Sequence, residues 1–203
     1  DLNNWNVTDG TDMGYMFYKA FVFNGNITSW DMSGKISFEA MFYYAYSFNQ
    51  DISNWDTSSV ASMSYMFTFA YSFNQDLPNW DVSSVNTFHK MFMRAGTRSG
   101  YTGTLDLSNW SLKTTGTINM SHMFYMWSPV VTLTLSGYGG SDFSTAAPQW
   151  HPVVTNWNVE RVNTMAYMFH SFTALGGIDM SNWNPTTLTS LASTFHTCTT
   201  FDG

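Results

Sequence analysis

Apolar positions recur along this chain of 203 residues in one arrangement that repeats about every 25 residues. Tryptophans mark the repeat at positions 5, 30, 55, 80, 110, 157 and 183, and the first three spacings are all 25. An apolar residue precedes each Trp by three positions, and in six repeats a Phe follows it by twelve. Self-similarity at such a period is typical of proteins built from stacked units.

The apolar columns predict the core, because each coil of a stack can bury its inner side only against its neighbours. A small residue also recurs fifteen positions after the Trp, at Ala20, Ala45, Ala70, Ala95 and Cys198. Within one unit, residues 52–56 are expected to form a short strand. The spacing of Val60, Met63, Met66, Phe67 and Ala70 indicates a helical turn after the cap-forming run 56–59. The sequence therefore predicts an α/β solenoid, a leucine-rich-repeat-like right-handed stack of about seven strand-plus-helical-turn coils.

We expect a single repeat domain over residues 1–203. Its coils, numbered 1 to 7, span about 1–25, 26–50, 51–75, 76–105, 106–152, 153–178 and 179–203. Both ends fall in register with the repeat, which favours either a segment of a longer array or a unit that stacks head to tail.

Coil 5 carries an inserted loop at 127–153, which includes an alternating, strand-like run at 130–135. Insertions in repeat proteins often form binding loops, and a flap that packs over a coil edge is the alternative. The candidate binding residues in this loop are Tyr138, Asp142, Phe143 and Trp150.

The run from Phe48 to Val60, FNQDISNWDTSSV, and the following MSYMF resemble the 25-residue unit of BspA-like leucine-rich repeat surface proteins. The resemblance combines the Trp, the Met-Phe pair, the Ala column and the Phe-Asn-Gln-Asp turn. It implies a leucine-rich-repeat-like solenoid that is secreted or displayed on a surface, often in adhesion or host contact. The family has no common catalytic residues. This chain departs from the pattern at its insertions, in two degenerate coils and in its aromatic outer positions.

Composition narrows the classes of partner. Only 10% of residues are charged, the net charge is −7, and seven Lys and Arg provide no basic stripe for nucleic acid. No run approaches 18 consecutive apolar residues, so we expect no membrane insertion in this segment. The single cysteine, Cys198, occupies the Ala column and is interpreted as a buried small residue, and no cofactor is expected.

Polar columns offer little chemistry. The five histidines form no zinc or nucleophile motif, so no catalytic residue is assigned. The Asn before each Trp suits an amide ladder between coils. Stacking would bring three carboxylates about 5 Å apart, where they either cap the following turn or, less favoured, hold Ca²⁺. These weak calcium candidates are Asp31, Asp56 and Asp81.

Aromatic residues at outward positions of the predicted helical turn are the best functional indication. Exposed Tyr is typical of contact surfaces, although the rings could instead fold over the coil edges. The candidate binding residues are Tyr15, Tyr18, Tyr43, Tyr44, Tyr65, Phe69, Tyr125 and Tyr167.

These features predict a non-enzymatic extracellular or cell-surface protein for structure or adhesion. It would contact a protein partner or associate with itself, head to tail or laterally. The alternative is a glycan-binding surface adhesin, in which rings stack on sugar faces.

Overall fold

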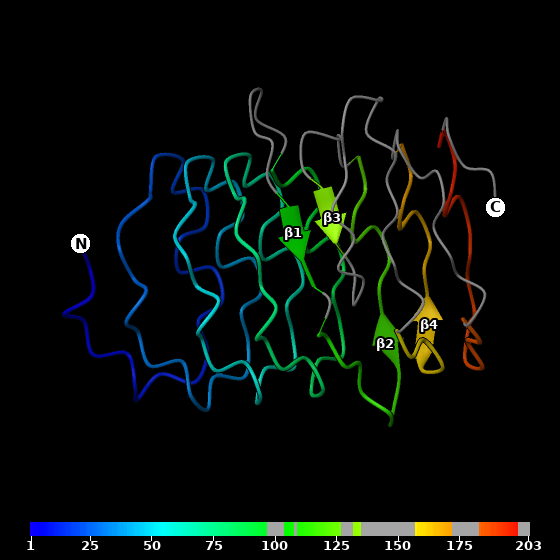
Figure 1. Cartoon of the computed structure of the whole chain (residues 1–203), viewed down its shortest axis with the longest axis horizontal. Helices are drawn as coiled ribbons and strands as arrows, with labels where there is room; N and C mark the ends of the chain where they lie inside the picture. The colour runs from blue at the N-terminus through cyan, green and yellow to red at the C-terminus, as the bar shows by residue number, and fades with distance from the viewer. Residues whose placement is uncertain (97–103, 108, 127–131, 135–156, 172–182, 199–203) are drawn as a thin grey trace.

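The computed structural model describes residues 1–96, 104–107, 109–126, 132–134, 157–171 and 183–198. Successive turns of the chain lie side by side along the longest axis, from the N-terminus at one end to the C-terminus at the other (Figure 1). Four short strands occur: β1 (Thr104–Asp106), β2 (Ile118–Asn119), β3 (Thr132–Thr134) and β4 (Val162–Thr164). β1 pairs in parallel with β3, and β2 pairs in parallel with β4.

The predicted α/β solenoid of strand-plus-helical-turn coils is wrong. The described residues contain no helix, and hence none long and apolar enough to cross a membrane. The expected strand at 52–56 is also absent, because these residues form a turn in which the Trp55 amide donates to the Ile52 carbonyl at 3.1 Å. The strand expected at 130–135 is confirmed for β3.

Parallel pairing between coils occurs seven residues after the Trp in the regular coils. Single bridges there join Asp12 with Ser37, Ser37 with Ser62, Ser62 with Thr87 and Thr87 with Asn119. Further along the chain, β2 meets β4, and Thr164 bridges to Ser190. The coils thus pair through single-residue bridges, at a position other than the strand that the sequence predicted.

Left-handed residues shape the segment that was expected to be helical. In coil 3, Tyr65 and Phe69 have φ of 60° and 59°. The amides of Tyr65, Phe67 and Phe69 donate to carbonyls of coil 4 at 2.8–2.9 Å, whereas the Met66 amide turns back to Met63 at 3.3 Å. The same two positions are left-handed in all coils, at Tyr15, Lys19, Ala40, Tyr44, Tyr65, Phe69, Lys90, Arg94, His122, Met126, Tyr167, Ser171, Ser193 and Thr197.

This backbone pattern explains the incorrect helix prediction. Only alternate amides, those of Met66, Thr68 and Ala70, bond back to the third residue before them. Together with positive φ at the third position of the turns that end at Met66 and Ala70, these bonds describe consecutive β-turns rather than a helix. Such turns place Met63, Met66, Phe67 and Ala70 inside at the same spacing as a helix. A left-handed non-Gly residue costs about 1–2 kcal/mol, so the bonds between coils must outweigh this strain.

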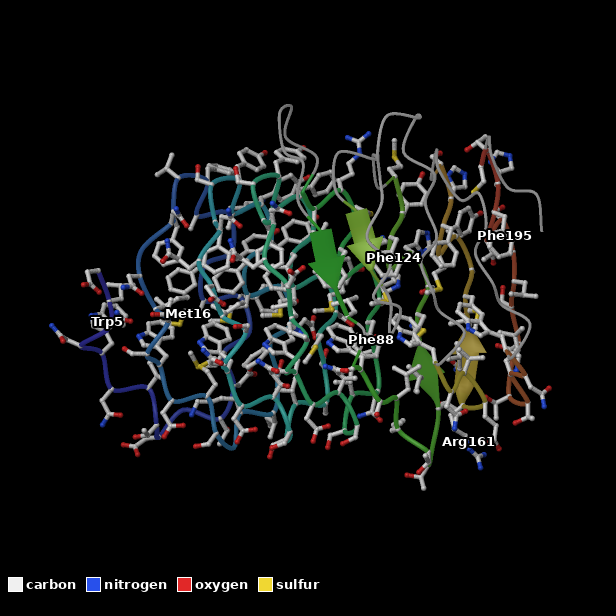
Figure 2. All side chains as sticks on the ribbon, viewed as in Figure 1. Trp5, Met16, Phe88, Phe124, Arg161 and Phe195 are labelled. Carbon is white, nitrogen blue, oxygen red and sulfur yellow. The ribbon has the colours of Figure 1, made fainter. Side chains whose placement is uncertain are left out.

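Phenylalanine columns form the centre of the core. Rings stack from coil to coil at centroid distances of 5.5–5.9 Å in the series Phe17, Phe42, Phe67, Phe92, Phe124, Phe169 and Phe195. A second column, Phe23, Phe48 and Phe73, has rings 6.1 Å apart and stacks against the first within each coil at 3.8–3.9 Å. Offset stacking at these distances is favourable, and the rings fill the interior where Phe88 and Phe124 lie (Figure 2).

Indole N–H groups tie the Trp column to the backbone. The Nε1 atoms of Trp30, Trp80 and Trp110 donate to the carbonyls of Leu2, Ile52 and Leu77 in the preceding coil at 2.8–3.0 Å. Among the described residues, the buried Nε1 atoms of Trp55 and Trp157 have no such partner.

Side-chain amides form a ladder of their own, at a position other than the predicted one. The Asn24 Oδ1 atom accepts from the backbone N–H of Asn49 at 2.9 Å, and the Asn49 Oδ1 atom accepts from the backbone N–H of Asn74 at 2.7 Å. The asparagines before the Trp, such as Asn54 and Asn79, are exposed.

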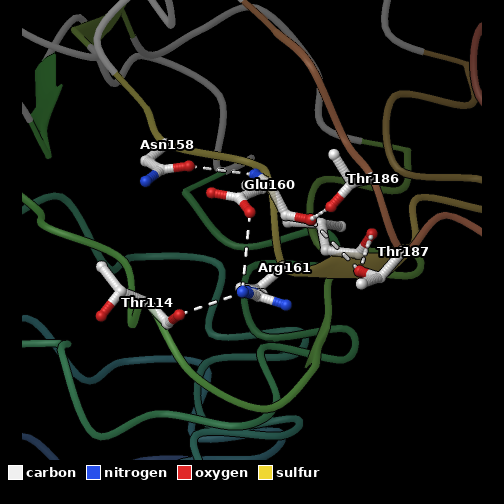
Figure 3. Close-up of polar contacts among 7 residues, drawn as sticks. Thr114, Asn158, Glu160, Arg161, Thr186 and Thr187 are labelled. Atoms are coloured by element: carbon white, nitrogen blue, oxygen red, sulfur yellow. Dashed lines mark hydrogen bonds and ion pairs between the residues drawn. The ribbon is translucent and has the colours of Figure 1, made fainter.

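A small polar group joins coils 5 to 7 (Figure 3). Arg161 donates from Nε to the Thr114 carbonyl at 3.1 Å and pairs with Glu160 at 3.6 Å. The Glu160 carbonyl accepts from the hydroxyls of Thr186 and Thr187 at 3.1 and 3.3 Å.

The same substitution at two buried alanines tests the left-handed backbone. Ala40 has φ of 51°, whereas Ala45 lies outside the left-handed region. Ala40→Gly relieves about 1–2 kcal/mol of strain against about 0.5–1 kcal/mol of chain entropy and about 0.8 kcal/mol for the buried methyl, so we expect a nearly neutral effect. Ala45→Gly loses a buried methyl and gains chain entropy, and it should destabilise by about 1–2 kcal/mol. Urea unfolding checks both variants, and equal losses at the two positions would contradict the backbone geometry.

A matched pair of Trp variants tests the indole hydrogen bond. Trp80 and Trp55 are both almost fully buried, but only Trp80 donates from Nε1 to a carbonyl. Trp80→Phe leaves the Ile52 carbonyl without this donor, so it should lower the free energy of unfolding by at least about 1 kcal/mol more than Trp55→Phe. Equilibrium denaturation measures the difference. Identical losses would show that the indole bond contributes nothing.

Candidate functional site

The outward aromatic residues predicted from the sequence lie along one edge of the stack, on the turns that contain the left-handed residues. We call this set the aromatic edge: Tyr15, Tyr18, Tyr43, Tyr44, Tyr65, Phe69, Tyr125 and Tyr167. Five of its members, Tyr15, Tyr44, Tyr65, Phe69 and Tyr167, are themselves left-handed. The conformation that directs alternate amides to the next coil therefore also places these rings at the edge.

Rings of the aromatic edge contact one another between coils. Tyr18 stacks on Tyr43 at 5.1 Å, and Tyr44 stacks on Phe69 at 4.5 Å. Tyr43 also meets Tyr65 edge-on at 6.0 Å. The contacts make coils 1 to 3 one continuous aromatic surface.

Exposure differs along this edge. The side chains of Tyr15 and Tyr18 are 55% and 41% exposed, whereas the other members are half-buried. Both interpretations drawn from the sequence thus apply in part, because the rings of coil 1 face solvent and those of later coils fold against their neighbours.

Cations and one carboxylate border the rings. Lys19 lies 5.1 Å from the Tyr18 ring, Lys90 lies 5.3 Å from Tyr65, and Arg94 lies 5.9 Å from Phe69. The Tyr15 hydroxyl donates to Glu39 at 2.7 Å, and this hydrogen bond raises the pKa of Tyr15. Burial raises the pKa of Tyr43 to about 12, so both hydroxyls stay protonated at neutral pH.

A second aromatic row was missed in the sequence. Phe21 stacks on Tyr46 at 5.0 Å, and Tyr46 stacks on Tyr71 at 4.9 Å. These residues all stand sixteen positions after a Trp, so their spacing was available as a signal. The row widens the aromatic surface of coils 1 to 3.

Histidines continue the aromatic edge toward the C-terminus. His89 and His122 fill the space between Tyr65 and Tyr167, with ring centroids 5.0, 5.5 and 4.7 Å apart along the series. Both imidazoles are half-buried.

The serine–histidine pair at His89 has a structural hydrogen-bonding pattern. His89 Nδ1 lies 2.6 Å from Ser121 Oγ, and the Ser121 hydroxyl donates to Asn119 Oδ1 at 2.7 Å. The Ser121 proton is therefore directed away from the imidazole, so His89 is not placed to activate this serine as a nucleophile.

The aspartates after the Trp cap turns, although these are not helical turns. Oδ1 atoms of Asp31, Asp56 and Asp81 each accept the amide two residues on, at 2.9, 3.0 and 2.9 Å. Hydrogen bonds from Ser33 and Ser58 lower the pKa of Asp31 and of Asp56. No group of three or more His, Cys, Asp or Glu suited to a metal ion occurs in the part of the chain that the structure describes.

The remaining candidates are the four residues of the inserted loop and Cys198. Tyr138, Asp142, Phe143 and Trp150 lie outside the described residues. Cys198 is half-buried against the core, and its thiol donates to the Phe169 carbonyl at 3.0 Å.

Comparison with known proteins places the chain in a repeat family. The family described as Mycoplasma protein of unknown function, DUF285, matches residues 1–45, 35–132 and 141–203. No curated protein and no solved structure matches the chain.

Substitution of one aspartate tests the turn caps. Asp56→Ala removes the acceptor for the Ser58 amide and should destabilise by about 0.5–1 kcal/mol, whereas Ser59→Ala at a neighbouring exposed position should have little effect. Because the folded-state pKa of Asp56 is lowered, its stabilisation is present above the ordinary pKa and is lost as pH falls through the lowered value.

The melting temperature should be the same with and without Ca²⁺. A calcium-induced rise that Asp56→Ala abolishes would indicate a metal site instead.

Proposed function

The chain belongs to the DUF285 family, a family of repeat proteins, and from this premise we propose a non-enzymatic structural or adhesion role. The protein would contact a protein partner or other copies of itself through its stacked coils. The aromatic edge carries this proposal.

Exposure and chemistry both support a contact role for that edge. Tyr15 and Tyr18 offer rigid rings that are each more than two-fifths exposed, with Lys19 and Glu39 beside them. Clustered exposed rings bordered by polar groups are typical of protein interaction surfaces. Stacking on the rings of coil 2 fixes Tyr18, so little side-chain entropy is lost on binding.

The non-enzymatic part of the proposal draws on the polar groups that could react. Ser121 and His89 are engaged in the hydrogen bonds between coils 3, 4 and 5. Lys35 is buried, and its ammonium donates to the carbonyls of Thr8 and Ser33. Each of these groups has a role in holding coils together.

Placement outside the cell rests on the resemblance to BspA-like surface proteins, which display similar 25-residue units. Under this proposal the protein is extracellular or bound at the cell surface, and its aromatic edge meets the contact partner there. Both head-to-tail and lateral self-association fit a stack of similar coils.

Glycan binding is the second candidate function, and the geometry of coil 1 favours it specifically. The rings of Tyr15 and Tyr18 lie 5.6 Å apart with a carboxylate and an ammonium nearby, which offers stacking faces and hydrogen-bonding groups for a sugar.

A double substitution distinguishes these functions. Tyr15→Ser with Tyr18→Ser removes two exposed rings, and Val22→Ser with Ile36→Ser removes two exposed apolar side chains outside the aromatic edge. Light scattering should show that the wild-type chain self-associates and that only the tyrosine variant loses this association, by tenfold or more.

Binding to a glycan array by a stable monomer, lost in the tyrosine variant, would favour the adhesin. The proposed contact role of the aromatic edge is contradicted if both double variants self-associate and bind glycans like the wild type.

A further inference from the structure

Four of the five histidines, His89, His122, His170 and His196, form one row across coils 4 to 7. His122 lies 5.5 Å from His89, and Tyr125 stacks on His170 at 4.8 Å. The His170 and His196 rings stack at 4.8 Å. Each junction between consecutive coils in this half of the described chain therefore includes an imidazole.

Hydrogen bonds fix the tautomer of His89. The Ser121 hydroxyl donates to Asn119, so Ser121 Oγ accepts from Nδ1–H of His89. The Nε2 atom of His89 must then accept from the Tyr65 hydroxyl, 3.1 Å away. A second proton on this imidazole would end that hydrogen bond, because the Tyr65 hydroxyl would have to turn and accept from Nε2–H.

His170 is fixed in the same way. The Thr197 hydroxyl donates to the His196 carbonyl at 2.7 Å, so it accepts from Ser171 Oγ at 2.8 Å. Ser171 Oγ in turn accepts from Nδ1–H of His170 at 2.8 Å. Nε2 of His170 is left as the acceptor for His196 Nδ1–H at 3.0 Å, so protonation there breaks this hydrogen bond unless the exposed His196 ring changes tautomer.

His122 has no partner for a second proton. Its Nδ1 atom is buried and makes no hydrogen bond among the described residues, while its ring stacks on Tyr167 at 4.7 Å and lies 5.4 Å from Tyr125. Burial, reinforced by Lys90, His89 and His170, lowers the pKa of His122 to about 4.

The described groups around the row do not compensate a positive charge. Tyr65, Tyr125 and Tyr167 are its aromatic neighbours, and Lys90 is the cation beside it. No carboxylate of the described residues is among the groups that shift the pKa of His89, His122 or His170.

We propose that this imidazole row is an acid-sensitive joint, which holds coils 4 to 7 together while its rings are neutral and opens them when protons are added. The proposal is independent of the function proposed above. Its basis is that protonation of His89 or His170 disrupts a hydrogen bond that the neutral ring accepts, and that the buried Nδ1 atom of His122 has no acceptor for a proton among the described residues.

The direction of the pH effect follows from linkage. Burial lowers the folded-state pKa of His89 and of His170 as well as that of His122, so the unfolded chain binds more protons in mild acid. The stabilisation is complete above the ordinary histidine pKa of about 6.5 and is lost as pH falls toward the lowered folded-state values. Asp31, Asp51 and Asp56 have lowered pKa values, so they stay ionised through the upper part of this window.

Amide hydrogen exchange at pH 7.5 and pH 5.5, corrected for intrinsic rates, tests the joint in the whole chain. Segments 119–126 and 165–171 should lose about tenfold of their protection at pH 5.5. This pH lies about one unit below the ordinary histidine pKa, so the opened state binds a proton that folded His122, with a pKa of about 4, does not bind. Segments 13–20 and 38–45, which contain no histidine and whose alternate amides donate to coils 2 and 3, should keep theirs. Equal loss in all four segments, or no loss in any, would overturn the proposal.

Variants assign the effect to imidazoles. His122→Phe keeps a ring between Tyr125 and Tyr167 and should remove at least half of the acid response, whereas Tyr167→Phe, which also keeps its ring, should leave the response intact. His196→Gln alters an exposed side chain, so it tests the His170 contact even if His122→Phe fails to fold. A wild-type acid response in His196→Gln, and in His122→Phe where it folds, would refute the imidazole joint.

Discussion

The alternation of backbone hydrogen bonds, outward to the next coil and back into the same coil, is the constraint on which this structure depends. Tyr65, Phe67 and Phe69 donate to coil 4, and the amides between them close turns within coil 3. Because two residues per coil must be left-handed for this pattern, the backbone accepts strain in return for regular contact between coils. The Phe columns then stack in register, and rings collect at one edge.

Periodicity made the buried residues predictable, but not the backbone that buries them. The described members of the Trp, Met, Phe and Ala columns are confirmed as core in coils 2 to 6, since side chains repeating at one period must meet their counterparts in neighbouring coils, whereas Trp5 and Met16 in coil 1 are exposed. The helix was wrong because consecutive turns bury Met63, Met66, Phe67 and Ala70 at the same spacing. Left-handed Tyr and Phe leave no mark in a sequence, because Gly or Asn usually signals that conformation.

The candidate site was predictable only where columns are regular. Outward rings such as Tyr43 and Phe69 follow from the repeat, yet the histidine row does not. His89, His122, His170 and His196 stand nine, twelve, thirteen and thirteen positions after their Trp residues, so only the last two share a column. Insertions and side-chain reach bring them together in space. Likewise, the amide ladder lies at Asn24 and Asn49, whereas the asparagines before the Trp are exposed to solvent.

The two halves of the stack therefore have different properties at the same edge. Coils 1 to 3 offer stacked tyrosines, and coils 4 to 7 are joined by neutral imidazoles. Both features depend on amides that leave their own coil. Scalar couplings measured through hydrogen bonds by NMR test this most directly. The account predicts couplings from the amides of Tyr65, Phe67 and Phe69 to the carbonyls of His89, Met91 and Met93. Couplings from the same amides to carbonyls four residues earlier, as in a helix, would contradict it.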